Sequence, residues 1–359
     1  MINQTAIAHP GSRLAVETRE LCKDFKESES SNRSLFGALT GGVRELLRPP
    51  KKRRVVDHIS LSIAHGEFFG IVGPNGAGKT TFLKLLCCML YPDGGSGSVN
   101  NHDLLRDRVS VRRSVVISPA QAWNGVGLLW QLTGRENLMF RARMSGVPKA
   151  EANRRTDYVL ERLGLAEKAR AHSWGWSAGE LHKMTLAMTF IARTPVVILD
   201  EPTSHLDPRV SRQIREFAKE ELGGRNGQTV ILSTHYLDEA DMLCDRVAIF
   251  HKGRVLASDT PAALKRTYAR ERILEIRALN YTSPIGERIK QKLQLLELLE
   301  QFEDTASGRV KLRPKSSTVP DVTLLRSELE AEGVEVLSVK WVMPTLEDVY
   351  FQLTKGEAV

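Results

Sequence analysis

Residues 73–81 read GPNGAGKTT and lie between a short apolar run at 68–72 and the helix-like TFLKLLCCML at 81–90. They match the pattern G-x-x-x-x-G-K-S/T in its strand–loop–helix setting. The glycines let successive backbone N–H groups turn toward one point, and the helix N-terminus adds partial positive charge there. The segment therefore predicts a loop that binds the phosphates of a ligand. A glycine-rich turn without a ligand is the alternative interpretation.

The side chains of this loop predict a nucleotide with an accompanying cation. Lys79 can reach β- and γ-phosphates, and Thr80 can hold Mg²⁺ through its hydroxyl. The residues expected to surround the phosphates are Gly73, Pro74, Asn75, Gly76, Ala77, Gly78, Lys79, Thr80 and Thr81.

Two later apolar runs end in polar residues, VVILDEP at 196–202 and TVILSTH at 229–235. In open α/β sheets, ligands bind at the carboxyl ends of the strands. Asp200 is expected to hold Mg²⁺ through water, and Glu201 to orient and polarise the attacking water. His235 is expected to contact the γ-phosphate and to respond to its loss. The alternatives are two solvated acids and a structural histidine.

The order of patterns along the chain predicts an α/β fold with a parallel sheet. Residues 14–25 and 55–67 resemble strands, the stretch 133–193 is mostly helical, and a hairpin is expected to turn at Lys252 and Gly253. After about residue 268 the pattern restarts as a small α/β appendage. Its strand-like runs are RILEIRAL, RVKLRP and VEVLSVKWV, and its helix-like runs are ERIKQKLQLLELLEQF, VTLLRSELEAEG and TLEDVYFQLTK.

Length and charge set broad limits. The 359 residues suggest about two domains, and the formal net charge of +8 suits a nucleic acid, an anionic membrane surface or a phosphorylated ligand. No apolar run approaches the roughly 20 residues of a membrane-spanning helix, and the N-terminus lacks a signal-peptide layout. We therefore expect a cytosolic protein. The cysteines at 22, 87, 88 and 244 have no zinc spacing, so reduced core residues are expected.

The segment WSAGE at 176–180 lies about 20 residues before the Asp–Glu strand and opens a helix. It resembles the L-S-G-G-Q signature loop of ABC proteins. Ser177 and Gly179 match that loop, whereas Trp176, Ala178 and Glu180 depart from it. With the phosphate loop, the chain resembles the nucleotide-binding subunit of an ABC transporter. The resemblance implies a P-loop NTPase of ABC type, with a mixed sheet core and a helical subdomain. It also implies that Ser177 and Gly179 cap ATP bound to a second subunit.

Three further segments carry the same resemblance. Gln121, in SPAQAWNG, is similar to the Q-loop glutamine that touches Mg²⁺, although Pro119 is one place further back than usual. Asp207, in SHLD, resembles the D-loop aspartate, and Phe25, in CKDFK, resembles the aromatic that stacks on adenine. A core aromatic is the alternative for Phe25. The resemblance thus implies ATP and Mg²⁺ as ligands, Glu201, His235 and Gln121 as catalytic residues, and Thr80, Gln121 and Asp200 at the metal.

The implied organisation is an ABC ATPase domain at 12–268 and an accessory α/β domain at 269–359. The ATPase domain would contain an insertion at about 27–54 and a helical subdomain at about 122–193. The tail PTLEDVYFQLTKG is similar to that of drug-, antibiotic- and lipid-exporting ATPases of the daunorubicin-resistance type. This implies a subunit at the cytoplasmic face of the membrane that dimerises on ATP and powers export through a separate permease. A homodimer is expected, and nucleic acid is not an expected partner.

Two alternatives remain open. A polysaccharide or teichoic-acid exporter ATPase would also carry an insertion between Phe25 and Val55. A soluble ABC ATPase of translation or DNA repair would suit the basic charge. However, the chain has one phosphate loop and no long coiled-coil insertion.

The run RPPKKRR at 48–54 lies in the expected insertion. Lipid headgroups attract such residues by about 1 kcal/mol each near an anionic surface. Our hypothesis is that residues 35–54 form a short amphipathic helix and a basic hook at the boundary between permease and membrane. A solvated hairpin is the alternative.

Overall fold

The computed structural model describes residues 13–26, 52–118, 127–204, 206–222, 227–269, 273–279, 283–295, 301–305, 309–313 and 321–354. The chain divides into two compact units, Met1–Pro261 and Ala262–Val359. Each is described by itself below. Among the described helices, none is both long and apolar enough to cross a membrane.

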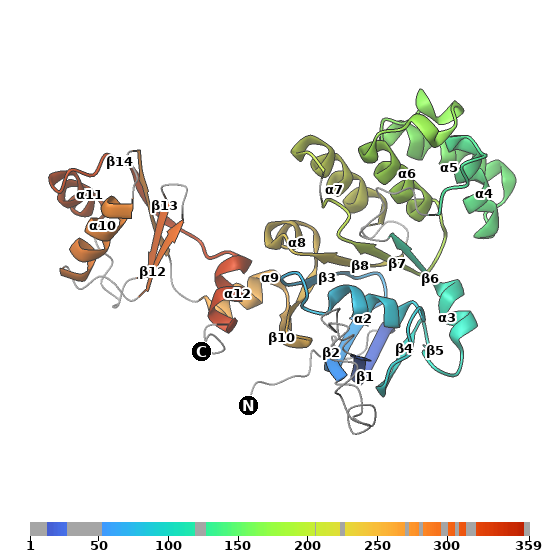
Figure 1. Ribbon diagram of the computed structural model, residues 1–359, viewed down its shortest axis with the longest axis horizontal. Coiled ribbons are helices and arrows are strands. Elements are labelled where there is room, and N and C mark those ends of the chain that lie inside the picture. Colours follow the sequence, from blue (N-terminus) through green and yellow to red (C-terminus); the bar gives the residue numbers. More distant parts are fainter. Residues whose placement is uncertain are drawn as a thin grey trace, which may run out of the picture. The chain divides into compact units, whose positions relative to one another are not determined.

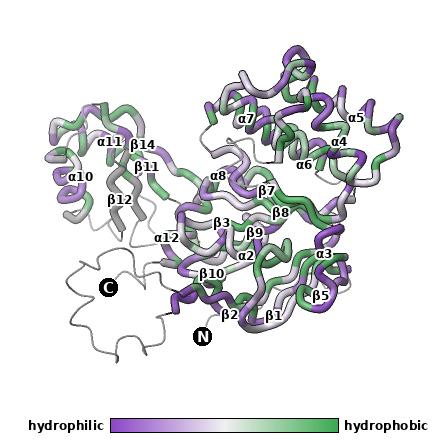
Figure 2. Tube along the Cα trace, turned by 45° about the vertical axis from the view of Figure 1, so that its right-hand side comes forward, coloured by the Kyte–Doolittle hydropathy of each residue, from purple (hydrophilic) through white to green (hydrophobic). Residues whose placement is uncertain are grey.

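The first unit is built on a mixed sheet with the strand order β10-β9-β3-β8-β7-β6 (Figure 1). Neighbouring strands are parallel except for the antiparallel β9–β10 pair. Figure 2 shows β7 and β8 as hydrophobic segments, and every residue of β3, β7 and β8 is buried, as expected for strands covered on both faces. The strands are β3 (Phe68–Val72), β6 (Val115–Ser118), β7 (Val196–Asp200), β8 (Thr229–Thr234), β9 (Arg246–His251) and β10 (Arg254–Asp259).

The pairing register places the ends of three strands at one edge of this sheet. Val72 of β3 is opposite Thr234 of β8, and Asp200 of β7 is opposite Ser233 of β8. The phosphate loop, Glu201 and His235 each follow one of these ends directly. The predicted gathering of polar residues at one sheet edge is therefore present in the fold.

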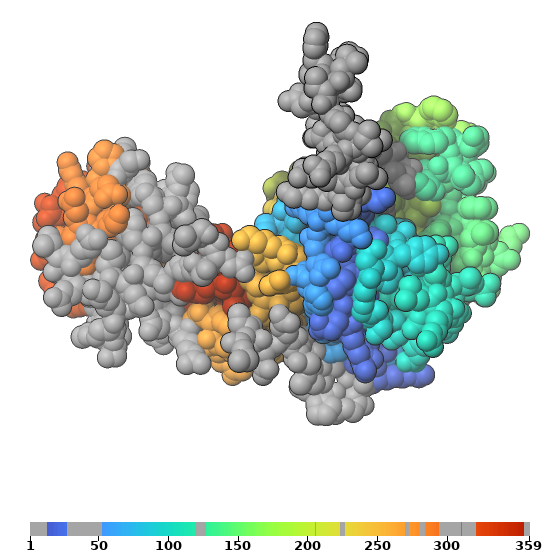
Figure 3. Space-filling model, turned by 60° about the horizontal axis from the view of Figure 1, so that its bottom comes forward, coloured from blue at the N-terminus to red at the C-terminus, as the bar shows by residue number. Residues whose placement is uncertain are grey.

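A second, antiparallel sheet has the order β2-β1-β4-β5. Figure 3 shows blue β1 and β2 beside the cyan residues of β4 and β5 on one face of the unit. Its strands are β1 (Leu14–Lys26), β2 (Lys52–Ala64), β4 (Gly94–Val99) and β5 (His102–Asp103). The glycine-rich β4 was not predicted. It needs a glycine because a Cβ at Gly97 would lie 2.8 Å from Leu104 Cδ1 and 3.1 Å from the Glu17 carbonyl oxygen.

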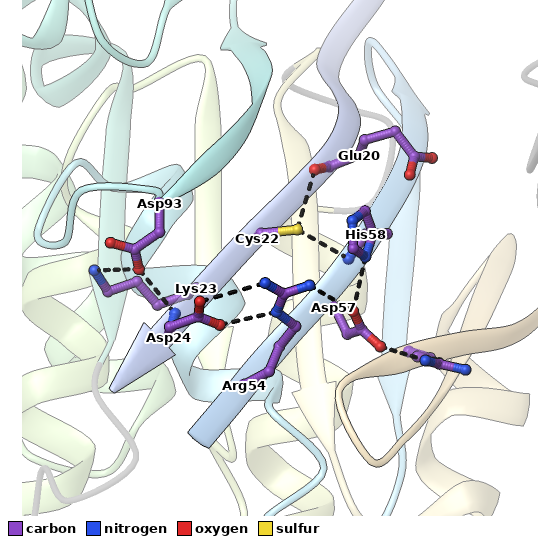
Figure 4. Close-up of polar contacts among 9 residues, drawn as sticks. Glu20, Cys22, Lys23, Asp24, Arg54, Asp57, His58 and Asp93 are labelled. Atoms are coloured by element: carbon purple, nitrogen blue, oxygen red, sulfur yellow. Dashed lines mark hydrogen bonds and ion pairs between the residues drawn. The ribbon is translucent and has the colours of Figure 1, made fainter. Parts of the chain in front are cut away.

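Strand β2 corrects the expected limit of the insertion at residue 54. Lys52, Arg53 and Arg54 are strand residues that pair with Lys26, Phe25 and Asp24 of β1. Arg54 bridges Asp24 on β1 and Asp57 on its own strand, at 2.9 and 3.5 Å (Figure 4). The last three residues of RPPKKRR are thus fixed in the sheet rather than in a hook. Residues 27–51 lie outside the described part of the chain.

Helices complete the first unit. A group formed by α4, α5 and α6 packs together and contains the predicted helical stretch (Figure 1). The helices are α2 (Lys79–Leu86), α3 (Arg108–Ser114), α4 (Gly134–Met144), α5 (Lys149–Arg162), α6 (Ala178–Phe190), α7 (Pro208–Leu222) and α8 (Leu237–Leu243), with short 3₁₀ turns at Lys168–Arg170 and Ser173–Gly175. The expected hairpin joins β9 and β10. Lys252 and Gly253 there have φ angles of 45° and 83°, as a two-residue turn requires. All four cysteines are buried free thiols, as predicted.

The second unit has an antiparallel sheet with the order β12-β13-β11-β14. Apolar residues from both strands and helices form its own core, including Leu274, Ile276, Ile289 and Leu325. The predicted helix through residue 302 is wrong at its end, because β12 begins at Gln301 and pairs with β13. The elements are α9 (Pro261–Tyr268), β11 (Ile273–Ala278), α10 (Ser283–Leu295), β12 (Gln301–Thr305), β13 (Arg309–Arg313), α11 (Val322–Ala331), β14 (Val336–Val342) and α12 (Leu346–Thr354).

Candidate nucleotide site

The loop between β3 and α2 has a backbone that only glycine fits at two points. Gly73 has φ +156°, and a Cβ there would lie 2.2 Å from the Phe250 carbonyl oxygen. Gly78 has φ +97°, and a Cβ there would lie 2.5 Å from the Val55 carbonyl oxygen. Neighbouring strands therefore pack directly against the loop backbone and fix its curl. Pro74, Asn75 and Gly76 at its tip are exposed.

Lys79 lies inside this loop and is buried. Its Nζ donates to the carbonyl oxygens of Gly73 and Pro74, at 2.7 and 3.2 Å. Burial lowers the pKa of Lys79, and the carboxylates of Glu201 and Asp200 oppose that shift. The ammonium group is thus held where the loop converges.

Thr80 and Asp200 form the next contact. The Thr80 hydroxyl donates to Asp200 Oδ2 at 2.9 Å, while Asp200 Oδ1 is buried and accepts no hydrogen bond within the described part of the chain. Burial raises the pKa of Asp200, and the hydroxyls of Ser233 and Thr80 oppose the shift. A hydroxyl and a carboxylate with an unsatisfied oxygen are hard donors of the kind Mg²⁺ prefers, so these residues fit the predicted cation.

Glu201 has an unusual backbone for its residue type. Its φ is 49°, in the left-handed region that non-glycine residues rarely occupy. Its backbone N–H donates to the Ser233 carbonyl oxygen at 2.8 Å, and the Ser204 hydroxyl donates to its Oε2 at 3.0 Å. Such conformations cost about 1–3 kcal/mol and gather at functional sites. The surrounding contacts therefore hold Glu201 in one fixed direction.

The other carboxylate oxygen of Glu201 faces two basic groups. Its Oε1 lies 3.6 Å from Lys79 Nζ and 3.4 Å from His235 Nδ1. The His235 ring also packs on Tyr236, with 4.1 Å between the ring centroids. The structure therefore brings together Lys79, Thr80, Asp200, Glu201 and His235, all from the predicted set.

Ser177 and Gly179 stand apart from this cluster. Ser177 is the exposed N-cap of α6, where its Oγ accepts from the Glu180 N–H and its own N–H donates to Glu180 Oε2. Glu180 in turn pairs with Lys168 at 2.6 Å. Nothing within 4 Å would obstruct a Cβ at Gly179. No hydrogen bond or ion pair joins Ser177 to the phosphate loop within the described ranges.

The remaining predicted residues are dispersed. Asp207 caps α7 by accepting from the N–H groups of Arg209 and Val210. Phe25 is 39% exposed at the end of β1, with Lys23 Nζ 5.6 Å from its ring centroid. Thr81 lies in the first turn of α2 and is partly buried. Gln121 lies outside the described residues.

The sequence analysis did not predict several residues that contact the site. Ser204 and Ser233 fix Glu201, and the segment that follows Glu201 is held by two buried groups. The Thr203 hydroxyl donates to Glu239 at 2.9 Å, and His182 Nε2 lies 2.7 Å from the Pro202 carbonyl oxygen. Burial raises the pKa of Glu239. Ser204 follows Glu201 by three residues and could have been found from the motif, but the other contacts join distant positions without a pattern.

A cavity of about 790 Å³ begins beside Thr80 and Asp200. It is largely apolar, with cationic side chains among its walls. The lining includes Lys84, Cys87, Met89, Arg112, Val115, Ile117, Arg141 and Met188. The walls come from α2, β6, α4 and α6, so the cavity lies between the sheet and the helical group.

Comparison with known proteins gives a consistent set of relatives. The family described as ABC transporter matches residues 56–204. The daunorubicin resistance ATP-binding protein DrrA3 of Streptomyces coeruleorubidus is 33% identical over 84% of this chain and 92% of its own length. The linearmycin resistance ATP-binding protein LnrL of Bacillus subtilis is 30% identical over 84% of this chain and 94% of its own length. A solved structure described as the ATP binding subunit of an ABC transporter superposes with a TM-score of 0.57 at 25% identity, over 71% of this chain and 93% of that one.

Proposed function

This chain belongs to the family of ABC transporter ATP-binding proteins, and from that premise we propose that it is the ATP-hydrolysing subunit of an exporter. The observation that carries the proposal is that Lys79 Nζ and His235 Nδ1 both lie within 3.6 Å of Glu201 Oε1 at one sheet edge. The relatives named for daunorubicin and linearmycin resistance support export of a drug-like compound. They also favour a transporter over an ATPase of translation or DNA repair.

Phosphate binding would replace contacts that the loop already makes. Lys79 donates to two loop carbonyl oxygens, and the β- and γ-phosphates of ATP offer stronger, charged acceptors at the same place. The loop N–H groups and the N-terminus of α2 add favourable dipoles. Thr80 and Asp200 would hold Mg²⁺, which supplies charge neutralisation at the phosphates when bound.

Glu201 is suited to act as the general base. Its carboxylate is held by Ser204 and by backbone bonds, so it can accept a proton from water without first reorienting. The Lys79 ammonium lies 3.6 Å from its Oε1, on the side where the phosphates are expected. His235 Nδ1 lies 3.4 Å from the same oxygen of Glu201. From this position His235 would contact the γ-phosphate and respond to its departure.

The second half of the site is expected to come from another copy of the chain. Ser177 and Gly179 are accessible at the N-terminus of a 13-residue helix, which suits an incoming γ-phosphate. In a two-fold dimer, each chain would supply its phosphate loop to one ATP and its Ser177 loop to the other. Phe25, exposed on β1, would stack on the adenine, Asp207 would face the partner, and Gln121 would approach the Mg²⁺.

A membrane permease is the second expected partner, with this subunit at the cytoplasmic face. The cavity between the sheet and the helical group supports this proposal, because its apolar walls and cationic rim suit a short amphipathic segment. Because Thr80 and Asp200 line one end of the cavity, a displacement of these residues on nucleotide binding would change the shape of the cavity. The exposed cations Lys26, Lys52 and Arg53 at the base of the insertion would favour anionic lipid headgroups nearby.

The test is the ATPase activity of the purified chain with and without its permease. We expect Mg²⁺-dependent ATP hydrolysis that Glu201→Gln abolishes while ATP binding persists. A wild-type chain that binds ATP but never hydrolyses it, alone or with a permease, would refute the proposal. Co-purification with ribosomes or DNA in place of a membrane protein would favour the soluble alternative.

A further inference from the structure

One buried hydrogen bond joins the Ser177 helix to the segment that carries Glu201. His182 lies on α6, five residues after Ser177, and is 1% exposed. Its Nε2 lies 2.7 Å from the carbonyl oxygen of Pro202, the residue directly after Glu201. A carbonyl oxygen can only accept, so Nε2 carries the proton and donates. The bond therefore fixes both the tautomer and the direction of the His182 ring.

The segment after Glu201 also makes polar contacts with α7 and α8, and the Ser211 hydroxyl of α7 donates to the Thr203 carbonyl oxygen at 3.4 Å. Thr203 donates to Glu239 of α8 at 2.9 Å, and the Ser204 hydroxyl donates to the Glu201 carboxylate at 3.0 Å. Pro202 has no N–H of its own to donate. His182 therefore gives α6 a direct polar contact with the residue that follows Glu201.

Helix α6 is a rigid connection between the two ends of this path. Ser177 and His182 are separated by about 7.5 Å along the axis, at 1.5 Å rise per residue. The capping bonds between Ser177 and Glu180 tie the helix start to its first turn. A displacement of the Ser177 end therefore moves His182 with it. The next residue in the path is Glu201, which is bonded directly to Pro202 and has a left-handed backbone with a φ of 49°.

We propose that His182 is a positioning residue that couples the Ser177 loop to the Glu201 carboxylate of the same chain. The inference rests on the proposed dimer, in which these two groups serve different ATP molecules. ATP contacting Ser177 from the partner would then adjust, through His182 and Pro202, the base that hydrolyses the chain's own ATP. His182 thereby makes the two sites of one dimer dependent on each other.

Mixed dimers, purified through two different affinity tags, distinguish two roles of His182. In one role it positions Glu201 of its own chain, and in the other it only stabilises the Ser177 loop. In the first dimer, one chain carries His182→Leu and the other carries Glu201→Gln. Hydrolysis then depends on the Glu201 that follows the altered contact, while the Ser177 loop serving that site is intact. In the second dimer, one chain carries both changes and the other is wild type. The Glu201 that can act as a base then belongs to the wild-type chain, and the Ser177 loop at its site belongs to the chain with His182→Leu.

We expect kcat of the first dimer to fall about tenfold, within the range typical of coupling between sites, with KM for ATP unchanged. We expect the second dimer to match a dimer of wild type with Glu201→Gln alone. The opposite result, with loss in the second dimer only, would show that His182 merely supports the Ser177 loop and would overturn the proposal. Equal activity of all three dimers would overturn it as well.

Conservative variants keep the test decisive if His182→Leu does not fold. His182→Gln retains a donor with similar reach and should restore most of kcat, whereas the shorter His182→Asn should not. Thr156→Val is the matched control, because Thr156 is a buried polar residue of the same helical group that bonds only weakly to a methionine sulfur. It should leave kcat unchanged. Failure of the wild-type dimer to hydrolyse ATP would refute the proposed function, whereas a loss confined to the wrong mixed dimer refutes this inference alone.

Discussion

Lys79, Asp200 and Glu201 are held by contacts from three strands and their loops, whereas Ser177 is held by bonds within its own helix. The first group is buried or partly buried. Lys79 Nζ lies 3.6 Å from Glu201 Oε1, and Asp200 accepts from the Thr80 hydroxyl at 2.9 Å. Ser177 is exposed, and its capping partner Glu180 is three residues away. Both groups are expected to contact the same kind of ligand.

The difference shows which half of the ATP site a single chain completes. The strand-end half already has its polar groups oriented before any nucleotide arrives, which reduces the reorganisation needed for binding and for hydrolysis. The Ser177 half has a formed helix start but no ligand-directed contact in its own chain. Substitutions in the first half should therefore alter binding or chemistry in every assembly state, and those in the second half should act only once two chains meet.

Lys79→Ala should have the largest effect on ATP binding. The substitution removes the one cation at the centre of the loop and its bonds to the Gly73 and Pro74 carbonyl oxygens. We expect ATP affinity to fall at least about 100-fold, because charge-assisted hydrogen bonds contribute about 1.5–3 kcal/mol each. Isothermal titration with ATP measures this. Lys149→Ala, at the exposed start of α5, is the control. Equal affinity in both variants would contradict the placement of the phosphates.

Glu201→Gln should abolish turnover but keep binding. The amide retains the size and the Ser204 contact but cannot accept a proton as a base. We expect kcat to fall about 100- to 10,000-fold, the range associated with a general base. ATP should then trap a dimer, visible by size-exclusion chromatography in ATP and absent in ADP. Unchanged turnover in this variant would remove Glu201 from the proposed mechanism.

Ser177→Ala should have an intermediate effect and should separate the two halves. Loss of a hydroxyl contact to phosphate should lower kcat about 10- to 100-fold, while the affinity of the isolated chain for ATP stays unchanged. Loss of the cap also destabilises the helix by about 1 kcal/mol. Thr133→Ala controls for that term, because Thr133 and Glu136 form the same capping box on α4. If Thr133→Ala lowered kcat equally, the loss of kcat in Ser177→Ala would come from a less stable helix and not from a lost contact to phosphate.

Asp200→Asn should have the smallest effect, on stability without nucleotide. Burial raises the pKa of Asp200 above its ordinary value of 3.8, so ionisation destabilises the folded state as pH rises through that raised pKa. The neutral amide lacks this penalty. We expect the melting temperature of the variant to exceed that of the wild type at neutral pH. The gain should shrink as pH falls and disappear below the ordinary value of 3.8, where the carboxyl is protonated in both the folded and the unfolded state. If the gain in melting temperature did not change with pH, it would come from packing of the amide and not from the loss of a buried charge.

The sequence predicted the features that depend on local pattern and missed those that depend on distant packing. The phosphate loop, the apolar strands before Asp200 and His235, and the turn at Lys252 and Gly253 each follow from adjacent residues. The glycine-rich β4 was missed because its glycines accommodate Leu104 and β1 rather than marking a turn. The strand at Gln301 was missed because a helical pattern runs into it. The bond between His182 and Pro202 joins positions 20 residues apart and leaves no signal in either neighbourhood.

Strand pairing at the base of the insertion has a practical consequence. Lys26 and Lys52 are direct partners across β1 and β2, so the intervening segment leaves and re-enters the sheet at one point. Closing a longer loop costs little, about 0.6 kcal/mol for each doubling of its length. We therefore expect that segments of different length and chemistry can replace residues 27–51, because the pairing of Lys26 with Lys52 keeps the register of β1 and β2. Grafting a reporter domain between Lys26 and Lys52 would give a labelled ATPase whose Lys79, Asp200 and Glu201 are positioned by other strands and loops.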